Sequence, residues 1–360
     1  MTLLLVGLLI LLALLGLPLF IALAGGSLLA TYNAGLDPAL LAVELNRLAS
    51  SPHLAAIPLF TFAGVILAAG GAPQRMIQLF NASVGWLPGG MAGVAIASCA
   101  FFTAFSGASG VTILALGGLM FPMLLHAGYK ERFTLGLLTT SGSLGLLFAP
   151  SLAILLYGIV AGVSIDQLFL AGIVPGFLLM LMLGLYALYI GRKADIPRHE
   201  FSVAALGTAF REGIWDIFLP IGILTGIFGG YVTITEASAC TAIYVLLLEG
   251  VIHREIHLVK HLPSLLRDTA VLVGSILIIL SVAMGLTNLL IDAQVPMKIL
   301  EWMSIHVDSQ LQFLLLLNAF LLIVGCMMDI FSAIVVVAPL IIPIAESYGV
   351  NSIHLGIIFL

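Results

Sequence analysis

The chain has 360 residues, of which 62% are hydrophobic and only 8% are charged, whereas a soluble domain has roughly 45 to 50% and about 25%. So few charged groups cannot cover a water-soluble protein of this length, which predicts an integral membrane protein with roughly ten membrane-embedded segments. The net charge of -5 excludes a nucleic-acid-binding protein, and three widely separated cysteines exclude a disulfide framework.

Long apolar runs predict membrane helices, because a helix satisfies its own backbone hydrogen bonds in lipid. The first run lacks the basic start of a signal peptide, so we interpret it as a retained helix. The runs are 2 to 30, 54 to 70, 91 to 125, 134 to 162, 167 to 190, 213 to 231, 234 to 248, 269 to 291 and 310 to 345. The short alternating segments of a barrel are absent, so the expected fold class is an all-α polytopic membrane protein.

Two runs, 91 to 125 and 310 to 345, are too long for one crossing and are interrupted near the middle. The interruptions lie at 105 to 110 and at 328 to 332. We expect each run to form a re-entrant helical hairpin, which enters and leaves on one side of the membrane. The run 134 to 162 contains glycine and proline near its middle and is predicted to be a broken helix.

The order of the segments repeats coarsely, because 54 to 70 corresponds to 278 to 294 when the two hairpin tips are aligned. With both hairpins re-entrant, ten of the 12 Lys and Arg residues fall on one side, which the positive-inside rule makes cytoplasmic. The hairpins then open to opposite sides, and this arrangement predicts an inverted-repeat secondary transporter.

The two repeats define the expected domain organisation. We predict a first repeat over 1–190, a cytoplasmic linker over 191–212 and a second repeat over 213–360. The counterpart of the first broken helix would lie at about 358 to 386, so we expect the second repeat to be truncated, with one or two further helices following Leu360.

The first hairpin tip concentrates the small polar residues Ser106, Gly107, Ser109, Gly110 and Thr112. Glycine allows unwound backbone, whose carbonyls, together with hydroxyls, are the oxygen ligands that hard cations prefer. Small residues also suit close helix packing, which is the alternative interpretation. A second alternative is a rhomboid-like intramembrane serine protease with Ser109 as nucleophile, but all eight histidines lie outside the predicted spans.

The broken helix supplies a second set of candidate residues, Gly142, Ser143, Gly145, Pro150 and Ser151. Glycine and proline interrupt a helix and release carbonyls that ions, water or hydroxyls then satisfy. A simple kink is the alternative. Two interrupted elements in the same half favour a binding site.

Asp329 is the only carboxylate expected deep within a membrane segment, where a charge is costly unless it has a partner or a function. An ion ligand, a proton carrier and a cap of the second hairpin tip are all open interpretations. Pro339 is expected to shape the following hairpin arm. Thr233 and Glu236 have the spacing of a capping box at a helix start.

Three histidines, His253, His257 and His261, recur at the spacing of one helical face. A metal site is possible from this spacing, but no carboxylate or cysteine joins them. We expect these histidines to lie in the headgroup region of the membrane.

Four stretches of the sequence resemble the large membrane subunit of TRAP (tripartite ATP-independent periplasmic) transporters, and the resemblance covers essentially the whole chain. The stretches are 106 to 110, 141 to 151, 168 to 176 and 229 to 237. Two residues depart from the usual pattern: Ala108 replaces a serine, and Ala149 replaces the first residue of a double proline.

The resemblance implies a sodium-coupled importer of an organic acid, such as a dicarboxylate or sialic acid, and not an enzyme. It implies elevator-type motion in the cytoplasmic membrane of a bacterium or archaeon, a periplasmic binding protein and a small membrane subunit as partners, and Na+ as coupling ion without an organic cofactor. A stand-alone antiporter or symporter is the alternative.

The family's binding residues carry over onto matching positions in both hairpins. One ion site and one substrate wall would be framed by Ser106, Gly107, Ser109, Gly142, Ser143, Gly145 and Pro150, and the other ion site by Gly325, Asp329 and Pro339. Sodium itself would be held at Ser106, Gly107, Ser109, Gly142, Gly145, Gly325 and Asp329.

Overall fold

In the computed structural model, every regular element among the described residues is a helix, as the apolar runs predict. The described residues are 7–9, 11–12, 15–35, 37, 39, 43, 46, 50–51, 53–107, 109–193, 201–307 and 309–360. They form two compact units, each described here by itself. Unit 1 comprises Met1–Leu54, Leu156–Ser164 and Val271–Leu360, and unit 2 comprises Ala55–Leu155 and Ile165–Ala270.

Unit 2 is built around the first predicted hairpin. Its helices are α4 (Ala56–Ala69), α5 (Ala72–Val84), α6 (Gly90–Ser106), α7 (Ser109–His126), α8 (Glu131–Leu144), the 3-10 turn η1 (Gly145–Leu147), α10 (Ile165–Lys193), α11 (Val203–Phe228), α12 (Ile234–Leu247) and the π-helical turn η2 (Leu248–Ile252). It also takes in the first parts of α9 (Leu152–Ala161) and α13 (Leu258–Asp292).

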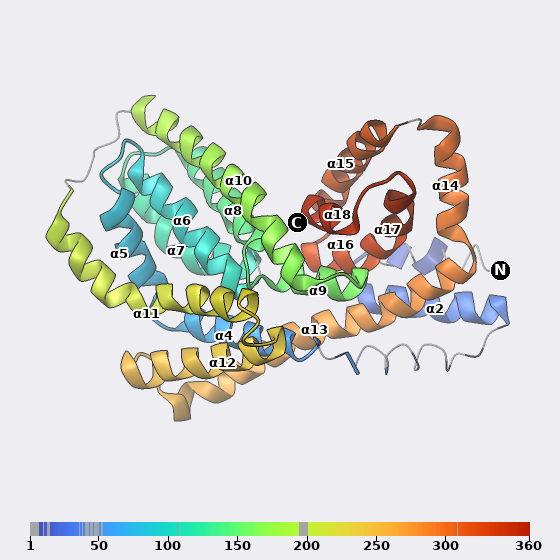
Figure 1. Ribbon diagram of the computed structural model, residues 1–360, viewed down its shortest axis with the longest axis horizontal. Helices are drawn as coiled ribbons and strands as arrows, with labels where there is room; N and C mark the ends of the chain where they lie inside the picture. Colours follow the sequence, from blue (N-terminus) through green and yellow to red (C-terminus); the bar gives the residue numbers. More distant parts are fainter. Residues whose placement is uncertain are drawn as a thin grey trace. The chain divides into compact units, whose positions relative to one another are not determined.

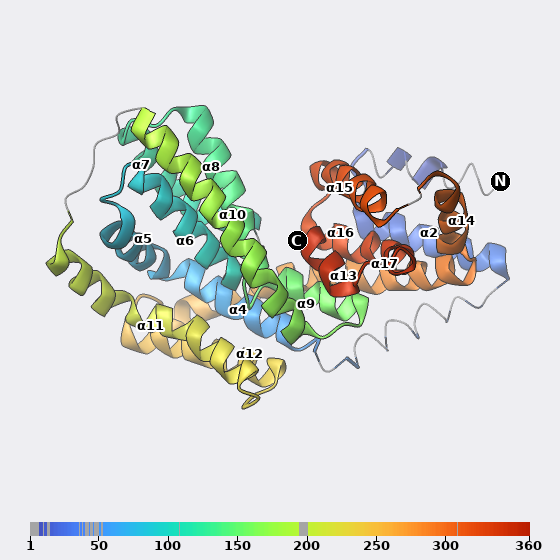
Figure 2. The same cartoon turned by 45° about the horizontal axis from the view of Figure 1, so that its top comes forward.

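Helix α6 is the centre of unit 2, since it packs against α4, α5, α7, α8 and α10. Figures 1 and 2 both show α6, α7, α8 and α10 side by side. Most side chains of α6 are buried, among them Phe102, Thr103 and Phe105. Outside this cluster, α5 packs against α11 and α4 packs against α12.

Unit 1 holds the second predicted hairpin. Its helices are α2 (Leu19–Ala34), the remainder of α9 and α13, α14 (Val295–His306), α15 (Gln310–Met327), α16 (Ile330–Val336), α17 (Ala338–Ser347) and α18 (Ser352–Phe359). Tyr157 on α9 anchors α18, because its hydroxyl donates a 2.7 Å hydrogen bond to Ser352 O and its ring is fully buried. Gly356 leaves room for that ring, because a Cβ there would lie 2.5 Å from Tyr157 Cε1.

The helices of both units include several that are long and apolar enough to cross a membrane. Among the described residues these are Ser109–His126, Ile165–Lys193, Ile234–Ile252 and Lys260–Asp292, and counting each bent pair as one span raises the number from 4 to 8. Helix α10 presents large apolar side chains outward, such as Val174, Leu181 and Met182. Such a surface matches lipid, as the composition requires.

The predicted interruptions are confirmed as breaks between helices. The run 91 to 125 divides into α6 and α7 at Gly107, and the run 310 to 345 divides into α15 and α16 at Met328 and Asp329. The broken helix is also confirmed, because residues Glu131–Leu147 and Leu152–Ala161 meet at 50°. A further bend of 72°, which the sequence did not indicate, separates α4 from α5 at Gly70 and Gly71.

Two predicted local features have different outcomes. The capping box is confirmed: Thr233 N donates to Glu236 Oε2 at 2.7 Å, and Glu236 N donates to Thr233 Oγ1 at 3.3 Å. The prediction that the three histidines share one helical face is wrong, because His253 follows η2 while His261 lies in α13, with a non-helical connection between them. The interruption prevents the three rings from sharing one helical face.

Candidate functional site

The first hairpin tip turns at Gly107, which adopts a left-handed conformation with φ of 63°. Its N–H donates a 2.8 Å hydrogen bond to Thr103 O and so ends α6. A Cβ on this residue would overlap Leu152 at the start of α9, so glycine is required both by the backbone conformation and by the close packing. Ser106 Oγ and Thr112 Oγ1 lie 3.0 Å apart across the turn.

The broken helix lies directly against this hairpin. Thr103 Oγ1 on α6 donates a 2.8 Å hydrogen bond to Gly142 O on α8. Gly145 follows at the break, where a Cβ would overlap Ala100 O and lie 2.5 Å from Thr103 Cβ. A Cβ on Gly142 would lie 2.5 Å from Ile113 Cγ1 on α7. Gly145 therefore allows the chain at the break to approach the backbone of α6, and Gly142 makes room for the Ile113 side chain of α7.

Helix α4 supports the tip from another side. A Cβ on Gly64 would lie 2.7 Å from both Phe105 O and Ser106 Cα. The last turn of α6 is thus enclosed by α4, α8 and the start of α9, and Ser106 and Gly107 are both buried. Carbonyl groups at the end of a helix lack intrahelical partners, so this enclosure gathers acceptor oxygens in a protected place.

Two serine hydroxyls in the broken helix are completely buried without a hydrogen-bond partner among the described residues. They are Ser141 Oγ, one residue before Gly142, and Ser151 Oγ, directly before α9. A buried hydroxyl without a partner costs about 1 to 3 kcal/mol, so such groups call for a ligand or water. Ser151 was predicted, whereas the burial of Ser141 follows from its spacing with Leu137 and Leu138 on the buried face of α8.

The remaining predicted site residues of the first half differ in how exposed they are. Pro150 is buried beside Ser151, and Ser109 is partly buried at the start of α7. Gly110 and Ser143 are exposed, and Ser143 Oγ donates to Thr140 O of its own helix at 2.9 Å. Ala108 lies outside the described residues.

The predicted residues of the second half lie in unit 1. Asp329 caps α16: its Oδ2 accepts from Phe331 N at 3.0 Å and Ser332 N at 3.2 Å, and its Oδ1 accepts from Ser332 Oγ at 2.5 Å. Gly325 is exposed in α15, and Pro339 is partly buried in the first turn of α17. Of the three open interpretations of Asp329, the cap is the one that its hydrogen bonds display.

The carboxylates buried within the protein are different ones. Asp329 is exposed at the protein surface, whereas Asp216 on α11 and Glu249 in η2 are, among the described residues, the most deeply buried carboxylates, with 1% and 0% exposure. Both pair with Arg75 near the start of α5, which is itself 7% exposed. The pairs are 141 and 174 residues apart in the sequence, so no local spacing indicates them.

Known proteins are similar in sequence to this chain over nearly its whole length. Residues 6–360 match the family described as "Tripartite ATP-independent periplasmic transporter, DctM component". The chain is 34% identical to the C4-dicarboxylate TRAP transporter large permease protein DctM of Pseudomonas aeruginosa, over 88% of this chain and 74% of that protein. The chain belongs to the DctM family.

Two further relatives are similar to this chain over an even larger share of its length. A protein of the same name from Rhodobacter capsulatus is 32% identical over 98% of this chain and 83% of its own length. The ectoine TRAP transporter large permease protein TeaC of Halomonas elongata is 30% identical over 99% of this chain and 84% of its own length. As a DctM-family member, the chain is a multi-pass membrane protein and a transport permease, which is not an enzyme.

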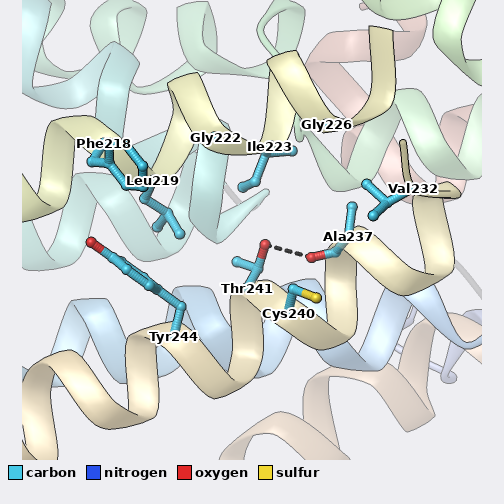
Figure 3. A pocket seen from close by; sticks show the side chains of 10 residues that line it. All are labelled: Phe218, Leu219, Gly222, Ile223, Gly226, Val232, Ala237, Cys240, Thr241 and Tyr244. Atoms are coloured by element: carbon cyan, nitrogen blue, oxygen red, sulfur yellow. Dashed lines mark hydrogen bonds between the residues drawn. The ribbon is translucent and has the colours of Figure 1, made fainter. Parts of the chain in front are cut away.

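The DctM-family chain also has an apolar hollow that the sequence did not indicate, between α11 and α12 (Figure 3). Phe218, Gly222 and Gly226 face Cys240 and Tyr244 across it. Thr241 lines the hollow, but its hydroxyl already donates to Ala237 O at 2.7 Å, and none of the described residues that line the hollow is charged. The hollow therefore lacks the oxygen ligands that distinguish the hairpin tip.

Proposed function

We propose that this chain is the large permease subunit of a sodium-coupled secondary transporter that imports a small organic acid. The named relatives are permeases for C4-dicarboxylates and for ectoine, and these solutes have in common a carboxylate on a small polar molecule. The observation that carries the proposal is the packing of the first hairpin tip against the broken helix, joined by the hydrogen bond from Thr103 to Gly142.

Sodium suits the chemistry of this cluster. It is a hard cation that prefers oxygen ligands, and the cluster offers serine hydroxyls and carbonyl oxygens at a helix end. The proposed sodium ligands come from Ser106, Gly107, Ser109, Gly142 and Gly145, with the hydroxyls of Ser141 and Ser151 as additional candidates. Buried hydroxyls without protein partners are suited to a transported ion, because the ion can satisfy them without displacing an existing hydrogen bond.

A second sodium site is proposed around Gly325, Asp329 and Pro339. The Asp329 carboxylate accepts three hydrogen bonds, from Phe331 N, Ser332 N and Ser332 Oγ, and each carboxylate oxygen can accept more than one. The charged cap can therefore hold the start of α16 and still attract a cation.

The substrate contacts are proposed for the same tips. Helix starts attract carboxylates through their free N–H groups, and α7 and α9 both begin at the breaks. We therefore propose that the substrate carboxylate binds between the first hairpin tip and the broken helix, at Ser109, Gly110, Pro150 and Ser151. The two hairpins would move as a transport domain by an elevator mechanism within an inverted repeat.

The partners follow from the family description. "Tripartite" and "periplasmic" support a complex with a small membrane subunit and a periplasmic substrate-binding protein in a bacterial or archaeal cytoplasmic membrane. "ATP-independent" supports an ion gradient as the energy source.

Reconstitution tests this proposal directly. Proteoliposomes containing the permease and small subunit are supplied with the cognate binding protein loaded with a radiolabelled C4-dicarboxylate or ectoine. We expect uptake driven by an inward sodium gradient, with none when choline replaces sodium. Equal uptake in choline contradicts sodium coupling, and uptake that persists without the binding protein and small subunit favours a stand-alone transporter.

A further inference from the structure

One arginine of unit 2 faces three carboxylates. Arg75 Nε and Nη2 donate to the two oxygens of Asp216 at 2.7 and 3.1 Å, and Nη1 donates to Glu255 Oε2 at 3.0 Å. Nη2 also donates to Glu249 Oε1. The four side chains come from the start of α5, the middle of α11, η2 and the segment after η2, so the cluster joins elements that are far apart in the sequence.

The charges of this cluster do not balance when every group is ionised. One guanidinium then faces three carboxylates, which leaves two excess negative charges. Glu249 is 0% exposed and Asp216 is 1% exposed, whereas the side chain of Glu255 is 39% exposed. Solvent can stabilise an excess charge on Glu255, but a second one within the buried part of the cluster is strongly unfavourable.

The second excess charge falls on the carboxylate of Glu249. Asp216 receives two N–H groups from Arg75 in the bidentate geometry that favours an ionised carboxylate. Glu249 Oε2, in contrast, is buried and receives no donor from the part of the chain that the structure describes. It lies against the bend between α4 and α5, where a Cβ on Gly70 would overlap it.

Two other titratable groups lie beside the cluster, His253 and Tyr244. His253 follows η2, and burial, together with the neighbouring Arg75, lowers the pKa of its imidazole and so disfavours its cationic form. Tyr244 on α12 donates its hydroxyl to Trp215 O at 2.9 Å, next to Asp216 in the chain. Arg75 is therefore the only cation among the groups just named.

A proton fits this position better than a metal ion. A metal needs several ligands arranged around a cavity, and no group of three His, Cys, Asp or Glu side chains among the described residues could hold one. A proton needs no cavity, because it binds to a carboxyl oxygen directly.

We propose that Glu249 is a proton-binding site, carrying a proton on its carboxyl group at neutral pH while Asp216 remains ionised against Arg75. The cluster then has one excess negative charge, on the partly exposed Glu255. Loss of the proton at alkaline pH places a second unbalanced charge where α5, α11 and η2 meet and weakens the packing of unit 2. This site is separate from the proposed sodium and substrate sites and does not depend on them.

Infrared spectroscopy of the permease complex tests the protonation directly. At neutral pH we expect the carbonyl stretch of a neutral carboxylic acid, which disappears on raising the pH and is missing in Glu249→Gln. The matched control is Glu301→Gln on α14, which alters an exposed glutamate and should retain the signal. A spectrum without that band in the native protein, or a band that persists in Glu249→Gln, overturns the proposal.

Thermal unfolding gives a second, independent measurement. An unfolded glutamate ionises at about pH 4.3, so a folded Glu249 that keeps its proton makes stability fall as pH rises above that value, until it ionises in the folded state too. We expect the melting temperature of Glu249→Gln, which resembles the neutral form, to decline less than that of the native protein and Glu301→Gln as the pH rises from about 4.3 to the value at which the folded Glu249 ionises. Identical pH profiles for all three proteins contradict a proton on Glu249.

Discussion

Thr103 and Gly142 connect the first hairpin to the broken helix through a 2.8 Å hydrogen bond between the hydroxyl of one and the carbonyl oxygen of the other. Thr103 is fully buried, and Gly142 lies where α8 approaches its break. The bond satisfies a carbonyl and holds two interrupted elements in a fixed register. It therefore links the sequence pattern of small polar residues to the geometry on which transport is proposed to depend.

Removing this bond should loosen the site. Thr103→Val keeps the shape of the side chain but removes the donor, and we expect a loss of about 1 kcal/mol in stability and slower sodium-driven uptake. Thr139→Val is the matched control, because Thr139 is exposed and bonds to Leu135 O in its own helix. Melting temperature and uptake rate measure the two effects, and equal behaviour of the two variants would show that the bond is unimportant.

Two glycine-to-alanine substitutions in the broken helix should change the stability of the protein in opposite directions. A Cβ on Gly145 would overlap Ala100 O, so Gly145→Ala should cost about 1 to 3 kcal/mol through forced separation of α6 and α8. Gly136 lies in the same helix with open space around it, so Gly136→Ala should stabilise by roughly 0.5 to 1 kcal/mol through helix propensity. Thermal unfolding in detergent measures both, and a Gly145→Ala variant as stable as Gly136→Ala contradicts the close approach.

Removal of the buried serine hydroxyls should change the sodium dependence of uptake more than the stability of the protein. Ser141→Ala and Ser151→Ala each remove a hydroxyl that has no partner within the described part of the chain, so the folded state should be unchanged or slightly more stable. If these hydroxyls bind the coupling ion, the sodium concentration for half-maximal uptake should rise about tenfold, which corresponds to about 1.4 kcal/mol.

Ser143→Ala supplies the control for this experiment, since Ser143 is exposed and bonds to Thr140 O. It should leave sodium dependence unchanged. Unchanged sodium dependence in Ser141→Ala and Ser151→Ala as well would remove both hydroxyls from the ion site.

The helix breaks could be predicted from sequence because their causes are local. Gly107 ends α6 through its own backbone conformation, and Asp329 caps α16 through N–H groups two and three residues away. The Arg75 cluster could not be predicted in this way. Arg75 follows the α4–α5 bend and meets Asp216 only when α5 packs on α11, and helical periodicity indicates a buried face without naming the partner across it.

Asp329 combines the two kinds of information, because its role as a cap is local and its proposed role as a sodium ligand is not. Asp329→Ala removes both and should cost about 0.5 to 2 kcal/mol in stability, as does loss of a helix N-cap. Asp329→Asn keeps an oxygen that can accept from Phe331 N and Ser332 N, so the helix should remain capped and the protein stable. It removes the charge, however, so sodium-driven uptake should require a higher sodium concentration.

A cap without a charge provides the control for this comparison. Ser309 caps α15 by accepting from Gln312 N at 3.3 Å, so Ser309→Ala should lower the melting temperature without changing sodium dependence. Measuring melting temperature and sodium-dependent uptake on the three variants separates the roles. If Asp329→Asn matches the native protein in both measurements, the carboxylate acts only as a cap, since an amide oxygen then replaces it completely.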